Sequence, residues 1–167
     1  MARTVALATF LAFLPFIMAG QAPPVEIDGS KTPELIPDSE GFKVLFMITS
    51  DGPHGLPRAT RQSYLAGAGL TEPQIDLVID AANQYRVAMN AGNRKMQQLK
   101  APWPKGQPLP ENILLQFDAI FDSVVAKQGE IRKALESELG PEPFRKLLEF
   151  VRTRVKSDTT FVMGARR

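Results

Sequence analysis

A proline-rich segment separates two long stretches of helical apolar periodicity, and this arrangement constrains the fold more than any other feature. Ala101 to Pro110 (APWPKGQPLP) holds four prolines and cannot form the interior of a helix. Before it, apolar residues recur at steps of three and four from Ile75 to Leu99. After it, a wider stripe comprises Ile113, Leu114, Phe117, Ile120, Phe121, Val124, Val125, Ile131, Leu135 and Leu139. The sequence therefore predicts an antiparallel helical hairpin whose two apolar stripes bury each other.

The start of the first arm carries three agreeing signals. Thr71 suits the N-cap, and Gln74 three residues later completes a capping box. Leu70 and Ile75 occupy the two positions of a hydrophobic staple. We therefore expect this helix to begin after Thr71 and to run to about Lys100, with Gly92 as its weak point, because an interior glycine costs about 1 kcal/mol relative to alanine.

A similar pattern starts the last helix. Gly140 can serve as N-cap, Pro141 suits the first helical position, and Leu139 and Phe144 occupy the staple positions. We predict that the second arm ends near Leu139 and that one amphipathic helix follows from Pro141 to about Lys156.

The rest of the chain contributes shorter elements. The apolar run within residues 41–50 suits either a buried strand or a helix, and a short helix is favoured because no second strand candidate exists to pair with it. A modest helix is expected over residues 58–68. The predicted fold is thus all-α: a long antiparallel hairpin, short preceding helix and C-terminal amphipathic helix, within a helical domain at 41–158. Residues 23–40 are interpreted as an extended tether and residues 159–167 as a disordered tail.

Met1 to Met18 resembles an export signal. Arg3 supplies a positive charge, and Val5 to Met18 is an apolar run shorter than the roughly 20 residues of a membrane span. We expect cleavage after Ala19 or Ala22, so that residues 1–22 are removed and the mature protein is periplasmic or extracellular. An uncleaved anchor is the alternative. Because the sequence has no cysteine, an exported form must be stabilised by apolar packing without disulfides.

The Leu70-Thr71-Glu72-Pro73-Gln74 segment resembles the defining motif of the LTXXQ-motif periplasmic helical proteins, which include Spy- and CpxP-like chaperones, adaptors and heavy-metal-sensor relatives. The second helix start departs from it, with Gly140 in place of threonine and no glutamine at the last motif position. The resemblance implies a long-armed helical hairpin, often dimeric, that binds proteins or ions without catalysis. The alternative is that both segments are ordinary helix starts.

Residues for catalysis or metal binding are sparse. His54 is the only histidine, and Asp51 could orient it as a general base, but no nucleophile and base are visible as a pair. Met89 and Met96 lie on one helix face and are interpreted as core residues. The pairs Asp76/Asp80 and Asp118/Asp122 lack the flanking oxygen donors of a calcium site. We therefore predict no enzyme activity, no cofactor and no metal site, with a hydrolase using His54 as a distant alternative.

The clearest charge asymmetry lies at the C-terminal end. Residues 140–167 hold seven basic and three acidic side chains. Basic residues are placed opposite the apolar stripe of the last helix, with an aromatic beside them, and the predicted partner-binding set is Arg145, Lys146, Phe150, Arg152 and Lys156. Packing of Phe150 beneath residues 42–48 is the alternative.

The sequence as a whole favours an exported, non-enzymatic protein-binding module, chaperone-like or an envelope-stress adaptor. Other envelope proteins or unfolded clients are the expected partners, with a homodimer or an anionic membrane surface as further options and no nucleic acid. The alternative is a structural helical domain that oligomerises as a coiled coil.

Overall fold

The structure, a computed structural model, describes residues 25–52, 55–104 and 106–163. It confirms the all-α class, since helices dominate and the only sheet in the described ranges is a two-stranded ribbon. The predicted export signal and His54 lie outside the described residues. In chain order the elements are β1 (Val25–Asp28), η1 (Pro33–Leu35), α1 (Asp38–Thr49), α2 (Arg58–Ala66), α3 (Glu72–Lys100), α4 (Glu111–Leu139), α5 (Pro141–Phe150), the π-helical turn η2 (Val151–Val155) and β2 (Thr160–Met163).

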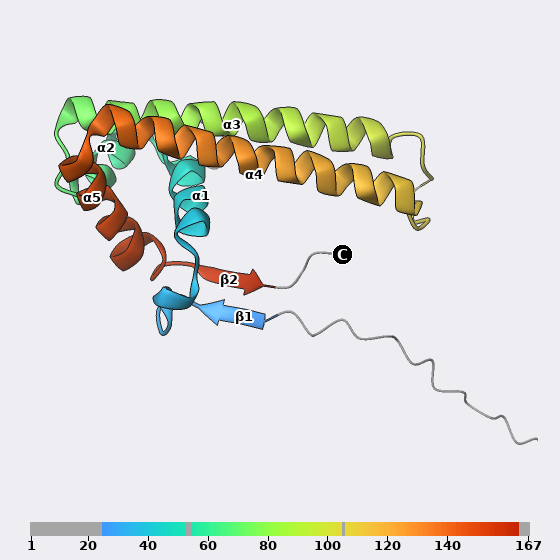
Figure 1. Ribbon diagram of the computed structural model, residues 1–167, viewed down its shortest axis with the longest axis horizontal. Helices are drawn as coiled ribbons and strands as arrows, with labels where there is room; N and C mark the ends of the chain where they lie inside the picture. The colour runs from blue at the N-terminus through green and yellow to red at the C-terminus, as the bar shows by residue number, and fades with distance from the viewer. Residues whose placement is uncertain (1–24, 53–54, 105, 164–167) are drawn as a thin grey trace, which may run out of the picture.

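The hairpin of α3 and α4 is present at the predicted bounds and is the longest feature of the molecule (Figure 1). At its start, the backbone N–H of Thr71 donates to Oε1 of Gln74 at 2.9 Å. Leu70 and Ile75, at the two staple positions, are both buried. Local sequence signals therefore determine where α3 begins. No helix of the described residues is long and apolar enough to cross a bilayer.

Gly92 marks a close approach of the two arms. A Cβ atom built on Gly92 would lie 2.8 Å from Cγ2 of Val124 in α4, closer than side chains tolerate. The glycine that the sequence suggests as a weak point of α3 therefore lets the two helices pack closely, although it lowers the helix propensity of α3.

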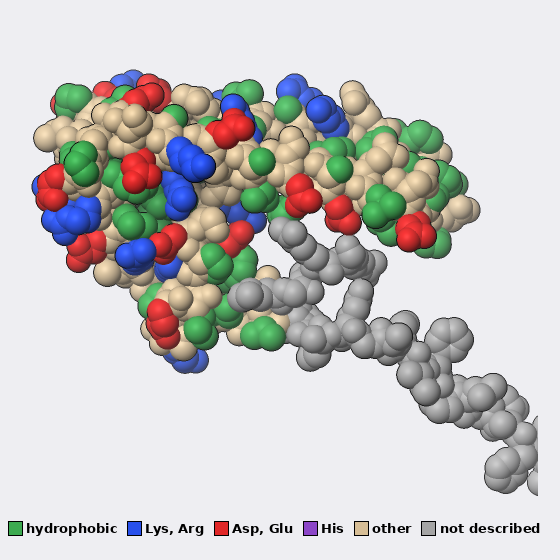
Figure 2. All heavy atoms as spheres, viewed as in Figure 1, with side chains coloured by type: hydrophobic (Ala, Val, Ile, Leu, Met, Phe, Trp, Pro, Cys, Tyr) green, Lys and Arg blue, Asp and Glu red, His purple; other side chains and the backbone are tan. Residues whose placement is uncertain are grey.

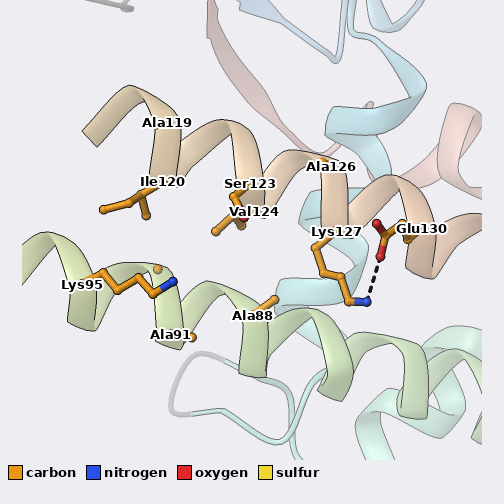
Figure 3. A pocket seen from close by; sticks show the side chains of 11 residues that line it. Ala88, Ala91, Lys95, Ala119, Ile120, Ser123, Val124, Ala126, Lys127 and Glu130 are labelled. Atoms are coloured by element: carbon orange, nitrogen blue, oxygen red, sulfur yellow. Dashed lines mark hydrogen bonds and ion pairs between the residues drawn. The ribbon is translucent and has the colours of Figure 1, made fainter. Parts of the chain in front are cut away.

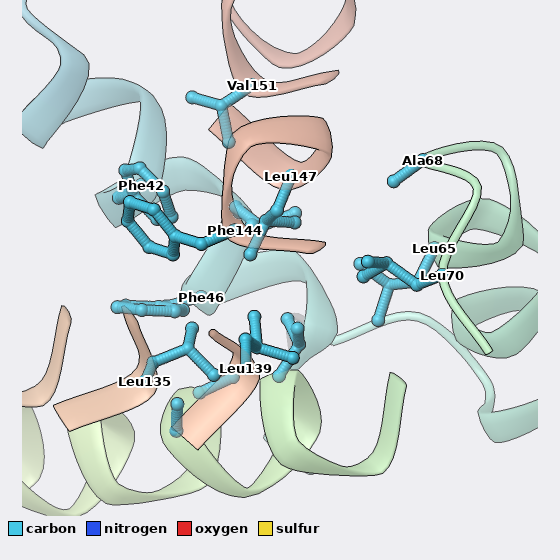
Figure 4. Close-up of a cluster of buried hydrophobic side chains, with 14 of the residues drawn as sticks. Phe42, Phe46, Leu65, Ala68, Leu70, Leu135, Leu139, Phe144, Leu147 and Val151 are labelled. Atoms are coloured by element: carbon cyan, nitrogen blue, oxygen red, sulfur yellow. The ribbon is translucent and has the colours of Figure 1, made fainter. Parts of the chain in front are cut away.

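The hydrophobic core lies at the base of the hairpin, around α1. Figure 4 shows Phe42 and Phe46 of α1 packed among side chains from α4 and α5, with the Phe42 and Phe144 rings stacked at 5.8 Å between centroids. Leu135 and Leu147 are fully or almost fully buried there. The prediction that the apolar stripes of the two arms bury each other fails at Phe121 in the outer half, which is 40% exposed. The reason is that α1 and α5 cover only the base.

Residues 25–36 form ordered structure where a tether was predicted. β1 pairs antiparallel with β2, with Ile27 opposite Phe161, and both Ile27 and Ile36 are buried. The predicted disordered tail of residues 159–167 is also wrong as far as Met163, because Thr160–Met163 forms β2. Each strand has four residues, and its partner lies at the opposite end of the chain, so local sequence carries little sign of the ribbon.

The residues before the hairpin form two helices. The apolar run of residues 41–50 belongs to α1, which resolves the strand-or-helix alternative in favour of a helix beginning at Asp38. α2 follows over nearly the predicted range. Together with the base of the hairpin and α5, they enclose the core.

The last helix is interrupted where the sequence predicts continuity. α5 ends at Phe150, and η2 follows as a π turn in which the Lys156 N–H donates to the Val151 carbonyl at 3.0 Å. A π turn inserts one residue into the helical register, so the side chains after it are rotated by about 100°. Val151 and Val155 are both buried, as expected for positions four residues apart.

Candidate protein-binding surfaces

The predicted basic face of residues 145–156 is divided by the structure. Arg145 is exposed and donates from Nε and Nη2 to the Glu142 carboxylate at 3.0 and 2.9 Å. Lys146 is exposed and forms no ion pair with any described residue. Arg145 and Lys146, together with the exposed Arg152, are therefore the members of the predicted set that remain as basic surface.

Phe150 is already packed against another aromatic ring. It meets Tyr64 of α2 edge to face, with centroids 5.1 Å apart and ring planes at 75°. Phe150 is half-buried and packs against the core cluster as well as against Tyr64, so it lies within the fold, as the alternative interpretation expected.

Arg152 and Lys156 share one carboxylate. Nη2 of Arg152 and Nζ of Lys156 each lie 2.6 Å from an oxygen of Asp38, at the first turn of α1. Hydrogen bonds from Arg152, together with the nearby Lys156 ammonium, lower the pKa of Asp38 to about 2. Lys156 is only 4% exposed, so its placement on an open basic face is wrong. The π turn explains the difference, because it rotates Lys156 towards α1.

The Asp51 carboxylate is likewise already paired with other side chains of the protein. Its carboxylate accepts from the Arg61 guanidinium and, at 2.7 Å, from Nδ2 of Asn83 in α3. The hydrogen bond from Arg61 lowers the pKa of Asp51 below its usual value. These contacts fix the end of α1 to α2 and α3. Asp51, proposed to orient His54, thus already has two partners within the fold.

A surface that the sequence did not reveal lies on the outer half of α4. The hairpin there projects beyond α1 and α5 (Figure 1), and four apolar side chains are exposed: Leu115 by 62%, Phe121 and Val125 by 40% each, and Leu114 by 39%. We call this surface the acidic–apolar stripe, and it consists of Glu111, Leu114, Leu115, Asp118, Phe121, Asp122 and Val125.

Charge and apolar area alternate along this stripe. Glu111, Asp118 and Asp122 are exposed, and Figure 2 shows acidic side chains spaced among hydrophobic ones on the projecting arm. At the inner end, Nζ of Lys43 in α1 lies 5.9 Å from the centroid of the Phe121 ring. The signal that could have revealed the stripe is the width of the α4 apolar pattern, which exceeds what one neighbouring helix can cover.

A shallow groove of about 470 Å³ runs between the two arms on a different side of α4. Figure 3 shows that small side chains line it, including Ala88 and Ala91 from α3 and Ser123 from α4, with Lys127 and Glu130 joined at one end. Its charged residues are Lys95, Lys127 and Glu130, and Lys127 and Glu130 are paired with each other.

The candidate metal ligands remain apart. Asp76 and Asp80 are exposed on α3, and Met89 and Met96 are half-buried along the hairpin. Among the described residues, no group of three or more histidine, cysteine, aspartate or glutamate side chains is close enough to hold a metal ion.

Comparison of the chain with protein-family models, with curated proteins and with solved structures found no match.

Proposed function

We propose that this chain is an exported, non-enzymatic protein-binding module, chaperone-like or an adaptor, and that it binds other proteins along the acidic–apolar stripe. The single observation that carries the proposal is the exposure of four apolar side chains on one projecting helix. Contiguous exposed apolar surface on a soluble domain is typical of a site that binds another protein.

The energetics favour binding at the stripe over binding at α5. Burying apolar area contributes about 25 cal/mol per Å², and aromatic anchors tend to carry interface energy. Phe121 and Leu115 still have area to bury, whereas Phe150 is already packed on Tyr64. Lys156 would have to leave Asp38 and its buried position before it could contact a partner, and the exposed guanidinium of Arg152 is already paired with the same carboxylate.

The test is suppression of aggregation of a chemically denatured client by the full chain. The change Leu115→Ser with Phe121→Ser should abolish most of the protection, because it removes apolar area without disturbing the core. Val87→Ser is the matched control, since Val87 is 60% exposed on the other arm of the hairpin. Equal protection by all three proteins would reject the stripe as the binding site.

A structural domain that oligomerises is the competing function. The observation that favours it is the seven-residue recurrence on α4, with Leu114 and Phe121 on one side of the helix, which suits pairing with a second copy. Mass measured from nanomolar to high micromolar concentration, for wild type and for Phe121→Ser, separates the two, since only the structural domain should self-associate through the stripe.

A further inference from the structure

The acidic side chains of the stripe recur with the apolar ones along one helix face. Glu111 and Asp118 are seven residues apart, as are Leu115 and Asp122. Seven residues make about two helical turns, so the members of each pair lie one above the other, and the whole stripe from Glu111 to Val125 is about 21 Å long. The stripe is therefore acidic and apolar along the same line.

Two carboxylates of the stripe, Glu111 and Asp118, differ in their pairing from others nearby. Glu130 pairs with Lys127 and Glu142 with Arg145, each across three residues of its own helix. Residues 111–126 contain no lysine or arginine, so the stripe has no cation of its own helix within its length. Glu111 and Asp118 form no ion pair with any residue in the described ranges. Their negative charge remains available to a partner.

The contact between Lys43 and Phe121 shows how a cation is accommodated at this surface. An ammonium group 5.9 Å from the ring centroid is attracted by the electron-rich ring face. Lys43 belongs to α1 and bounds the stripe at its inner end. Further out, a cation from a partner would meet the carboxylates of Asp118 and Glu111 beside the exposed Leu114 and Leu115.

Resting on the proposed function, we infer that the stripe selects a cationic amphipathic helix, with lysine or arginine at steps of three and four among apolar residues. Such a helix can lie along α4 with its apolar side chains over Leu115 and Phe121 and its cations beside the carboxylates. Complementary charge at the edge of an apolar contact sets partner choice and association rate. The same carboxylates repel an anionic membrane surface, which argues against that partner at this site.

The experiment compares two synthetic helical peptides with the full chain. One peptide carries lysine at its polar positions, and the other carries glutamate at the same positions. We expect the lysine peptide to bind at least tenfold more tightly at 50 mM salt, with most of the difference lost at 500 mM salt because screening is strong there. Glu111→Gln with Asp118→Asn should reduce the preference by about fivefold, as expected for rim charges.

The matched control is Asp76→Asn with Asp80→Asn, which neutralises two exposed carboxylates on α3. This control should leave the preference for the lysine peptide over the glutamate peptide unchanged, and circular dichroism should give equal helicity for all variants. Equal binding of both peptides, lost on Phe121→Ser, would overturn the inference while the proposed function stands. No binding of either peptide, with no protection of denatured clients, would reject both. If the wild type self-associates and Phe121→Ser abolishes this self-association, the stripe binds a second copy of the chain. That result would also overturn the inference.

Discussion

Nζ of Lys156 lies 2.6 Å from Oδ1 of Asp38, although 118 residues separate them in the chain. Lys156 follows the π turn and is buried, while Asp38 begins α1. The pair therefore holds the N-terminal helix against the C-terminal end of the chain. The β1–β2 ribbon emerges from the same junction, so the two ends of the described chain are fixed to each other at the base of the hairpin.

Removal of this carboxylate should destabilise the fold in a pH-dependent way. The pKa of Asp38 falls from 3.8 to about 2 in the folded protein, which corresponds to about 2 kcal/mol. Because the folded-state pKa is the lower one, this stabilisation is present above about pH 4 and is lost as the pH falls towards 2. Urea unfolding should show Asp38→Asn less stable than wild type by about 2 kcal/mol at pH 7, with the gap narrowing at pH 2.5. A gap that does not change with pH would contradict the assignment.

The helices could be predicted because their signals are local. Thr71, Pro141 and the proline segment specify helix ends wherever the rest of the chain lies. The ribbon and the pairing of the buried Lys156 with Asp38 could not be predicted, since each depends on residues far apart in sequence, and no local signal marked the π turn. Periodicity identified the apolar face of α4, but it could not tell which part of that face is covered. Leu135 and Phe121 share one pattern, yet only Leu135 lies where α1 and α5 pack.

The difference in burial between Leu135 and Phe121 leads to a prediction about the free energy of unfolding. Leu135→Ala should cost about 2–5 kcal/mol, because Leu135 is 2% exposed and its removal leaves a cavity. Phe121→Ala should cost less than about 1 kcal/mol, since the ring is 40% exposed. Chemical denaturation of both variants checks the ranking. A larger loss for Phe121→Ala would mean that the outer half of the hairpin is covered in solution.

Two glycines provide a matched test of hairpin packing. Gly129→Ala should stabilise the protein by up to about 1 kcal/mol, because no atom lies within 4 Å of the added methyl group and alanine favours the helix. Gly92→Ala should instead destabilise the protein by about 1 kcal/mol, since its methyl group would lie 2.8 Å from Val124 and the clash outweighs the gain in helix propensity. Melting temperatures of the two variants measure the difference. Equal stabilisation by both would show that the arms are further apart than the structure places them.

Export is expected from Arg3 and the apolar run of Val5 to Met18, which lie outside the described residues. Cell fractionation should recover a shortened chain, beginning near Gly20 or Pro23, in the soluble envelope fraction. Mass spectrometry of the intact protein gives the cleavage position. Full-length protein in the cytoplasm would refute this prediction.

Photo-crosslinking tests the central claim most directly, because it reports where a bound protein lies. A benzoylphenylalanine replaces Leu115 on the stripe, Val87 on the opposite arm or Lys146 on α5, one site at a time, and the full chain is irradiated with a denatured client. All three positions are exposed. The account predicts client adducts mainly from position 115, with few from 87 or 146. Adducts mainly from position 146, or equal yields from all three, would contradict it.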